Sequence, residues 1–296
     1  MAYSLLRPRA EIIQAIRTFF INREYLEVDT PIRLPCLIPE AHIEPEQSAG
    51  WLLQTSPEMC MKRLLAAGLP RIFQICRCFR RRERGSRHLP EFTMLEWYRS
   101  GIDYADLMAE CAELLRFVAA TVDCPDKSAA ALLGKADWQY LTVQQAFALH
   151  APLTVDQALA EDRFDEMVVR YLEPRLGGRR PTFLHDYPAS LGSLARLKNG
   201  DNSVAERFEL YVKGLELANG FSELTDAAEQ RQRFMRERAI IESQGRQSGP
   251  MPERFLAELG ELQSAAGIAL GVDRLVMLLC GAGSIDEVVA FTPESL

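Results

Sequence analysis

Two runs with period-two alternation, RIFQICRCFR and EFTMLEWYR, constrain the fold of this chain more than any other feature. Such alternation is typical of β-strands, and the ten-residue basic segment RRERGSRHLP lies between them. We therefore expect residues 71–80 and 91–99 to form an antiparallel hairpin with a strongly basic connection.

The second strand of this hairpin carries an acid among apolar residues. Alternation places Phe92, Met94, Glu96 and Tyr98 on one face. A buried carboxylate is costly unless a cation meets it. Glu96 therefore either pairs with an internal Arg or Lys or binds the ammonium group of a ligand. On the preceding strand, Arg80 is predicted to lie over the same surface as Phe92.

The basic connection has two interpretations. It holds five cationic or potentially cationic residues around the single acid Glu83, namely Arg81, Arg82, Arg84, Arg87 and His88. A charge run of this kind is typical of a solvated turn. With Arg80 and the ring of Phe92 beside it, the same segment also offers what an ATP site requires, which is cations for phosphate and an aromatic face for adenine.

A second hairpin is predicted from RFELYV and LELANGFSEL, with Lys213 and Gly214 as its turn. This register places Glu209 and Glu216 on one face. Two close carboxylates suit Mg²⁺, which completes its shell with phosphate oxygens and water, although two exposed acids would give the same pattern. Asn219, Phe221 and Glu223 alternate just beyond them. These three side chains can lie beside the two acids only if the strand contains a bulge near Ala218 or Gly220.

Composition limits the remaining possibilities. The chain has 296 residues, of which 48% are hydrophobic and 25% charged, as in ordinary globular proteins. Its net charge of −7 disfavours a general affinity for nucleic acid or anionic membranes. The first residues do not resemble a signal peptide and no apolar run is long enough to span a membrane, so we expect a cytoplasmic protein. The odd number of cysteines, seven, indicates neither a disulfide framework nor zinc, and Cys76 and Cys78 are interpreted as strand or core residues.

The remaining elements are predicted from periodicity and capping signals. A first helix is expected over 8–23 and a short strand in EYLEVDTP, followed by a loop-rich stretch over 32–50. A strand over 52–55 leads into a helix that begins at Ser56-Pro57-Glu58 and ends near Gly68. Helical patterns recur over 104–122 and 227–243, and GIALG is a strand that turns into the helix VDRLVMLLCG. No internal repeat occurs, so both halves are expected to share one core.

Arg274 lies in the first turn of that last helix, where its charge is unfavourable for the helix dipole. The position therefore calls for a salt bridge or a bound anion.

Together these segments resemble the catalytic domain of class II aminoacyl-tRNA synthetases. EYLEVDTP resembles motif 1, FRRRERGSRHLPEFTMLEW motif 2 and GIALGVDRL motif 3. TSPEMCMKRLL, PEFTMLEWY, FELYVKGLELANGFSELTD and GVDRLVM are similar to the lysyl-tRNA synthetase branch. The resemblance runs from about residue 7 to the C-terminus. It implies an α+β fold with a mainly antiparallel sheet flanked by helices, ATP and Mg²⁺ as requirements, and a homodimer built through motif 1.

Lysyl-tRNA synthetases carry an anticodon-binding domain before motif 1, whereas here six residues precede the resemblance. A single catalytic domain over 1–296 is expected. The chain is therefore most similar to the synthetase paralogues that activate (R)-β-lysine with ATP and attach it to a lysine of elongation factor P, with no tRNA involved. Three alternatives remain: a tRNA-dependent enzyme with a separate RNA-binding partner, an enzyme with a small-molecule acceptor, and a non-catalytic regulatory module.

The resemblance assigns roles by position. It implies that ATP is contacted by Arg80, His88, Phe92 and Arg274, and that Arg80 and Arg274 are catalytic. It implies Mg²⁺ ligands at Glu209 and Glu216. It implies an amino-acid pocket lined by Glu58, Glu96, Tyr98, Asn219, Phe221 and Glu223.

Several positions differ from the family pattern. Arg82 replaces an acid, with Glu83 displaced by one, Leu89 replaces an asparagine, and Gly260-Glu261-Leu262 replaces the usual G-[ML]-P. Ala269 stands where lysyl-tRNA synthetases have glycine. Its methyl is predicted to favour β-lysine over α-lysine, and the alternative is that it only packs the strand.

Overall fold

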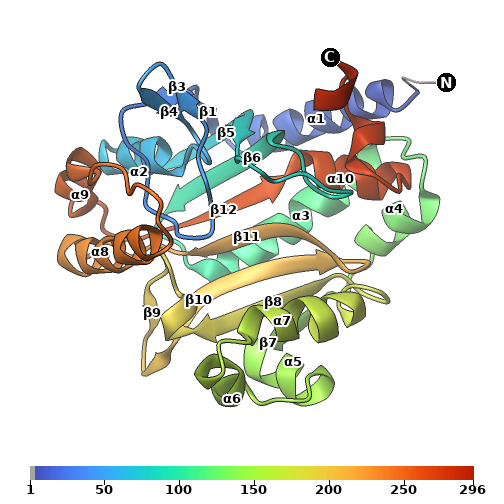
Figure 1. Cartoon of the computed structure of the whole chain (residues 1–296). Helices are drawn as coiled ribbons and strands as arrows, with labels where there is room; N and C mark the ends of the chain where they lie inside the picture. The colour runs from blue at the N-terminus through green and yellow to red at the C-terminus, as the bar shows by residue number, and fades with distance from the viewer. Residues whose placement is uncertain (1–3) are drawn as a thin grey trace.

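A large mixed sheet forms the centre of the computed structural model, which describes residues 4–296 (Figure 1). Its strand order is β1-β5-β6-β12-β11-β10-β8-β7, with β9 paired to β10. The β1–β5 and β7–β8 pairs are parallel and the other pairs are antiparallel. The strands are β1 (Leu26–Glu27), β5 (Arg71–Phe79), β6 (Glu91–Ser100), β7 (Gln139–Thr142), β8 (Thr182–Pro188), β9 (Leu197–Lys198), β10 (Asp201–Val212), β11 (Leu215–Ser222) and β12 (Ala265–Gly271). The predicted fold class, a mainly antiparallel sheet flanked by helices, is confirmed.

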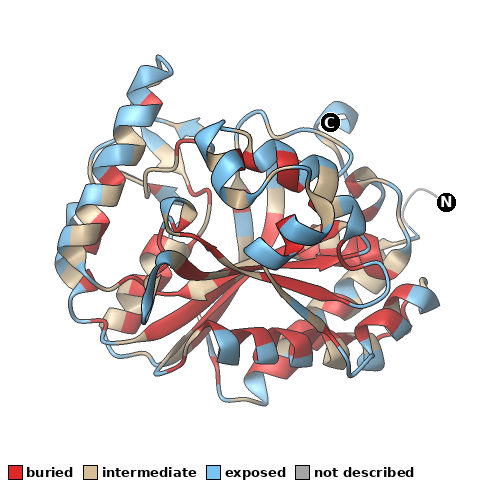
Figure 2. Cartoon of the chain, turned by 90° about the horizontal axis from the view of Figure 1, so that it is seen from below, coloured by how far each residue is buried: buried red, intermediate tan, exposed pale blue. Residues whose placement is uncertain are grey.

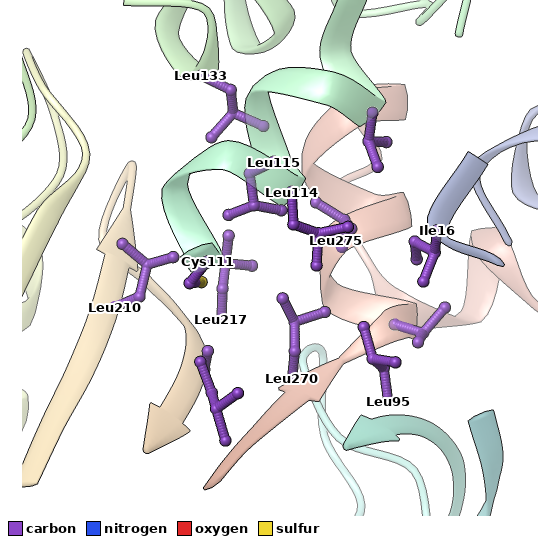
Figure 3. Packing of buried hydrophobic residues seen from close by; sticks show 14 of the residues in the cluster. Ile16, Leu95, Cys111, Leu114, Leu115, Leu133, Leu210, Leu217, Leu270 and Leu275 are labelled. Atoms are coloured by element: carbon purple, nitrogen blue, oxygen red, sulfur yellow. The ribbon is translucent and has the colours of Figure 1, made fainter. Parts of the chain in front are cut away.

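Helices cover one face of this sheet and bury the main core. They are α1 (Leu6–Ile21), α3 (Tyr104–Thr121), α4 (Lys127–Leu133) and α10 (Val272–Cys280). Figure 3 shows Leu95, Leu217 and Leu270 of the strands meeting Leu114 of α3 and Leu275 of α10. These side chains are buried, which excludes water from this side of the sheet.

The other face carries separate groups of helices and leaves space between them. A cluster that includes Met61, Phe234 and Leu256 joins the sheet to α2 (Glu58–Ala66), α8 (Ala227–Ser243) and α9 (Glu253–Leu259). Beside it lies a small sheet of β2 (Arg33–Leu34), β4 (Trp51–Leu53) and β3 (Gln47–Ser48). A third cluster packs on β8 and includes residues of α5 (Val143–His150), α6 (Val155–Ala160), α7 (Phe164–Met167) and the π-helix η1 (Val168–Leu172).

Short 3-10 turns complete the described chain. They are η2 (Glu173–Arg175), η3 (Ala189–Leu191), η4 (Ile285–Val288) and η5 (Pro293–Ser295). Figure 2 shows the central strands largely red, as buried residues, whereas the surrounding helices turn pale blue surfaces to solvent. No described helix is both long and apolar enough to cross a membrane.

Both predicted hairpins are confirmed. In the first, Cys78 pairs with Phe92 and Gln74 with Glu96. In the second, Val212 pairs with Leu215 and Tyr211 with Glu216. Lys213 and Gly214 have φ angles of 51° and 70°, as a type I′ turn requires. The register shifts between Leu210 and Tyr211, which leaves Leu217 as the extra residue, immediately before the predicted Ala218.

Some boundaries differ from the prediction. The first helix spans Leu6–Ile21 rather than 8–23, because the chain turns at Asn22 and reaches Glu24 with a φ of 61°. The strand in EYLEVDTP contains only Leu26–Glu27, since the partner strand β5 pairs no further along it. Pairing in the small sheet stops at Leu53, so the strand expected over 52–55 spans Trp51–Leu53.

A buried ion pair joins elements that are far apart in sequence. Asp273, 2% exposed at the start of α10, lies 2.5 Å from Nη1 of Arg9 in α1 and accepts a 2.7 Å hydrogen bond from the backbone N–H of Thr93 in β6. Arg9 also donates to Thr93 Oγ1 at 2.8 Å. This interaction fixes the first turn of α10, and therefore the backbone of Arg274, relative to the first hairpin.

Candidate active site

The first hairpin brings a cation over an aromatic ring. Arg80 follows β5 directly, and its guanidinium carbon lies 5.2 Å from the ring centroid of Phe92. The backbone N–H of Arg80 donates to Pro90 O at 2.9 Å, which holds the chain where it leaves the strand. The predicted alternation thus places Arg80 and Phe92 on one surface.

The basic connection is ordered by interactions within and beyond it. Gly85 and His88 form an antiparallel bridge. Arg84 donates to Asp286 and to both carboxylate oxygens of Glu294, each at 2.9 Å, so the loop is attached to the C-terminal segment. The connection is therefore more than a freely solvated turn.

The positions that differ from the family pattern have structural explanations. Arg82 is exposed, has a φ of 65° and pairs with Glu44 at 3.4 Å. Glu83 lies 3.9 Å from Nη1 of Arg80, so the displaced acid still faces this arginine. Leu89 is 4% exposed and joins the main core, where an asparagine side chain would need hydrogen-bond partners. Leu262 is likewise buried.

At one end of the site, Arg274 reaches back over the hairpins. Its Nη2 lies 2.6 Å from His88 Nε2, and its Nη1 donates to Glu216 O at 2.9 Å and Oε2 at 3.3 Å. Burial, followed by the charge of Arg274, holds the pKa of His88 below its ordinary value. His88 is therefore neutral at pH 7 and accepts from Arg274. Of the two partners expected for Arg274, a salt bridge or a bound anion, the salt bridge exists, and Arg274 thereby joins the two hairpins.

The two predicted metal ligands lie on one face of the second hairpin. Glu209 accepts from Arg207 at 2.7 Å and from the Tyr211 hydroxyl at 2.6 Å, whereas Glu216 contacts Arg274. Burial, and next the charge of Glu209, raises the pKa of Glu216. Two carboxylates that repel each other suit a divalent cation that takes few protein ligands. In the described part of the chain no three metal-ligating side chains form a cluster, so phosphate oxygens or water would have to supply the remaining ligands.

The other end of the site is rich in buried carboxylates. Glu96 is 1% exposed and accepts hydrogen bonds from Ser56 Oγ at 2.6 Å and Tyr98 OH at 2.7 Å. Burial, and next the charge of Glu58, raises the pKa of Glu96 to about 8. Within residues 4–296 no Arg or Lys pairs directly with it. Of the two readings made from sequence, the structure therefore excludes an internal ion pair for Glu96.

Lys62, which the sequence analysis did not single out, contacts the other two carboxylates. Its Nζ lies 2.5 Å from Glu58 Oε1 and 2.5 Å from Glu223 Oε2, and 4.9 Å from the centroid of the Phe221 ring. Burial alone would lower the pKa of Lys62, but Glu223 and Glu58 outweigh it and the pKa is raised. Lys62 is therefore charged. Its i,i+4 spacing from Glu58 was the one available signal in the sequence.

Small residues on β12 make room for these groups. A Cβ atom built on Gly267 would lie 2.1 Å from the Tyr98 ring and 2.8 Å from Glu223 Oε1, so only glycine leaves room for the Tyr98 ring whose hydroxyl donates to Glu96. Ala269 pairs with Glu96 on one side and with Asn219 on the other. Asn219 Oδ1 is buried and has no hydrogen-bond partner among the described residues, so a ligand could supply one.

A cavity of about 380 Å³ lies over this part of the sheet. Eight of the predicted residues line it, namely Glu58, Arg80, Glu96, Tyr98, Glu209, Asn219, Phe221 and Ala269. Five do not: Glu223 is buried behind it, and Phe92, His88, Glu216 and Arg274 lie outside its walls. Arg207, Tyr187 and Ser56, which were not predicted, also contribute to the wall.

The cysteines take no part in this cavity. The seven cysteines are free thiols in the described structure. Cys76 and Cys78 lie on β5 with their sulfur atoms 4.0 Å apart, and Cys78 is buried.

Comparison with known proteins gives a consistent result. Residues 1–295 match the family described as tRNA synthetases class II (D, K and N). The chain is 41% identical to "Elongation factor P--(R)-beta-lysine ligase" of Salmonella paratyphi B and of Salmonella heidelberg, and 42% identical to the protein of that name in Salmonella gallinarum. Each alignment covers 98% of this chain and 95% of the relative.

The carboxylate cluster makes a prediction about stability. Lys62→Met retains the volume of the side chain but leaves Glu58 and Glu223 buried without a cation. We expect the free energy of unfolding to fall by about 3–5 kcal/mol, as when one partner of a buried ion pair is removed. The measurement is urea denaturation followed by circular dichroism.

Lys127→Met is the matched control. Lys127 also pairs with an acid at i−4, Asp123, but its side chain is 72% exposed. Such surface pairs contribute about 0–1 kcal/mol. Equal stability of the two variants would show that Lys62 does not hold the cluster together.

Proposed function

The chain belongs to the class II tRNA synthetases of the D, K and N group, and on this basis we propose that it is an ATP-dependent ligase. We propose that it activates (R)-β-lysine as an adenylate and transfers it to a lysine side chain of elongation factor P. The three Salmonella relatives carry a name with this donor and this acceptor.

One observation supports this function more than any other. A single cavity is lined by several carboxylates, among them Glu58 and Glu96, and by the arginines Arg80 and Arg207. Carboxylates bind ammonium groups, and arginines bind phosphate. A lysine-type substrate carries one ammonium group at the far end of its chain and a second near its carboxyl group, so it needs carboxylates along the pocket and arginines where the activated carboxyl group meets phosphate. We propose that Glu58, Glu96, Glu223, Tyr98, Asn219 and Phe221 form the amino-acid pocket.

In the proposed activation step, the carboxylate of the amino acid attacks the α-phosphorus of ATP in line and pyrophosphate leaves with the bonding electrons. Arg80 and Arg274 stabilise the negative charge that develops on the phosphoryl oxygens, because both are held in place before the reaction. His88 and Phe92 are proposed to contact the γ-phosphate and the adenine. Glu209 and Glu216 would hold Mg²⁺, which neutralises phosphate charge when bound.

We further propose a homodimer built through the motif 1 segment. Ile21 at the end of α1 and Leu26 in β1 are 59% and 51% exposed, so apolar surface is available at this edge. We also propose that residues 1–296 act as one catalytic domain, because the main sheet takes its strands from both halves of the chain.

Activation is tested by the exchange of labelled pyrophosphate into ATP, with Arg80→Ala as the variant. Arg80 is a preorganised cation beside the proposed α-phosphate, so its loss should lower the exchange rate by on the order of 10²–10³. Arg77→Ala is the control, since Arg77 is exposed on the same strand. No exchange by the wild type with any lysine isomer would contradict the proposed function.

Proton release tests the role of Glu96. With a pKa of about 8 this group holds a proton at pH 7, and it must lose that proton to bind an ammonium. Affinity for β-lysine should therefore rise with pH up to about 8, by up to about tenfold per unit, and binding at pH 7 should release about one proton. Calorimetry in buffers of different ionisation enthalpy measures this number.

Glu96→Gln should bind β-lysine more weakly by roughly 2 kcal/mol or more and should release fewer protons than the wild type, because burial raises the pKa of Glu223 to about 8 as well. Glu91→Gln, exposed on the same strand, should behave as the wild type. Equal affinity of Glu96→Gln and the wild type would exclude this role.

The position of Ala269 in the cavity wall supports its proposed effect on the choice of isomer. Its methyl takes up space beside Glu96 and Asn219, where an α-amino group would need room. A difference of one methyl is typically worth about 1–3 kcal/mol, or roughly 10–200-fold. We expect Ala269→Gly to gain activity toward α-lysine relative to β-lysine by a factor in this range, measured as the ratio of kcat/KM values. An unchanged ratio would assign Ala269 to strand packing alone.

A further inference from the structure

A second cavity, of about 510 Å³, adjoins the candidate active site. Its walls come from the loop between β2 and β3, from the small sheet and from the segment that follows α8. None of the residues to which the resemblance assigns a role lines it, although Arg81 of the basic connection does. It shares two wall residues with the first cavity, Glu40 and Ile43, so the two spaces meet at this loop.

Glu40 lies at this junction with a free carboxylate. The side chain is half-buried and forms no hydrogen bond or ion pair with any described residue. Burial, and next the charge of Glu58, raises its pKa to about 7. The other charges that act on it come from three different elements: Arg80 after β5, Glu237 in α8 and Lys62 in α2. A half-buried carboxylate without a partner is costly, so this position suits a cationic ligand.

The backbone around Glu40 is held firmly. The N–H of Ala41 donates to Glu237 Oε2 at 2.8 Å, and Arg246 donates to Ala41 O. The N–H of Ile43 donates to Glu40 O at 3.3 Å. These contacts fix the loop against α8, and they leave the carboxylate of Glu40 available to both cavities.

Given the proposed function, we propose that Glu40 receives the ammonium group of the acceptor lysine and removes a proton from it. The adenylate would occupy the first cavity, between the carboxylates and the arginines. An acceptor must then approach from a space that borders this cavity, and the second cavity does so at Glu40. Its volume suits a lysine side chain with neighbouring residues. Leu37, Ile38 and Leu52 provide apolar wall for the methylene groups of that side chain.

The proposed transfer step moves two protons and exchanges one bond to the carbonyl carbon. The carboxylate of Glu40 takes one proton from the acceptor ammonium and leaves a neutral amine. The nitrogen lone pair attacks the carbonyl carbon of the aminoacyl adenylate, and a C–N bond forms. The bond between that carbon and the phosphate oxygen breaks, and AMP leaves with the electron pair. A second proton passes from nitrogen to solvent as the amide forms. A base with a pKa near the working pH is well suited to the first step.

The test separates activation from transfer. Pyrophosphate exchange measures activation, and the transfer of labelled β-lysine from preformed adenylate to elongation factor P measures the second step. In Glu40→Gln, transfer should fall by about 10² or more, the usual contribution of a general base, whereas exchange should stay within about twofold of the wild type. Glu261→Gln, an exposed acid after α9, should change neither rate.

Two further readouts exclude a structural role. Hydroxylamine is already neutral at pH 7, so it should capture the adenylate of Glu40→Gln at the wild-type rate. Transfer by the wild type should increase with pH and level off near pH 7, and this inflection should be absent from the variant.

The outcomes are distinguishable. Unchanged transfer in Glu40→Gln would overturn the inference while leaving the proposed function intact. A parallel loss of exchange would overturn it too, because Glu40 would then serve the donor amino acid. Absence of exchange in the wild type would instead refute the proposed function itself.

Discussion

The carboxylates buried on the open face of the sheet impose the constraint on which the site depends. Burial, together with the charge of Glu58, raises the pKa values of Glu96 and Glu223, and a single cation, Lys62, contacts Glu58 and Glu223. Such a cluster is stable only where its charges are neutralised or protonated. The remaining acid, Glu96, accepts hydrogen bonds from Ser56 and Tyr98, and Gly267 leaves the space that the Tyr98 ring needs.

The opposite end of the site meets the same requirement in a different way. Arg207 pairs with Glu209, and Arg274 pairs with Glu216 and lies against His88. A ligand could replace these partners: phosphate could bind the arginines, and a divalent cation could bind the acids. At this end the arginines and acids are thus paired with each other before a substrate arrives, and substrate binding would exchange partners instead of burying unpaired charge. The Arg9–Asp273 pair holds the backbone of Arg274 in place during such an exchange, because it fixes α10 on β6.

Much of this arrangement follows from the sequence, because strands have a period of two. The faces that carry Arg80, Phe92 and Glu96, and the shared face of Glu209 and Glu216, are properties of two local hairpins. The sequence indicated that the second hairpin needs a bulge but not at which residue. Its position at Leu217 depends on how β11 pairs with both neighbouring strands. Lys62 and Glu40 were missed for another reason. The i,i+4 spacing of Lys62 from Glu58 is common in surface helices, and only Glu223 on a distant element shows its role; no local pattern marks Glu40, whose neighbours come from other elements.

In the proposed pocket, charge and shape would contribute separately to the choice of amino acid. The proposed amino-acid end holds three carboxylates against one ammonium, so once Glu96 has lost its proton two negative charges are there for a ligand to neutralise. A substrate with two ammonium groups meets this demand. An amino acid with a single ammonium would leave one carboxylate either charged and buried or protonated at a cost set by its pKa. In the proposed pocket, charge would therefore select lysine-type substrates as a class but could not distinguish isomers, which carry the same charges. That distinction requires a steric contact near the reacting carboxyl group, and the side chain of Ala269, between Glu96 and Asn219, stands where such a contact would act.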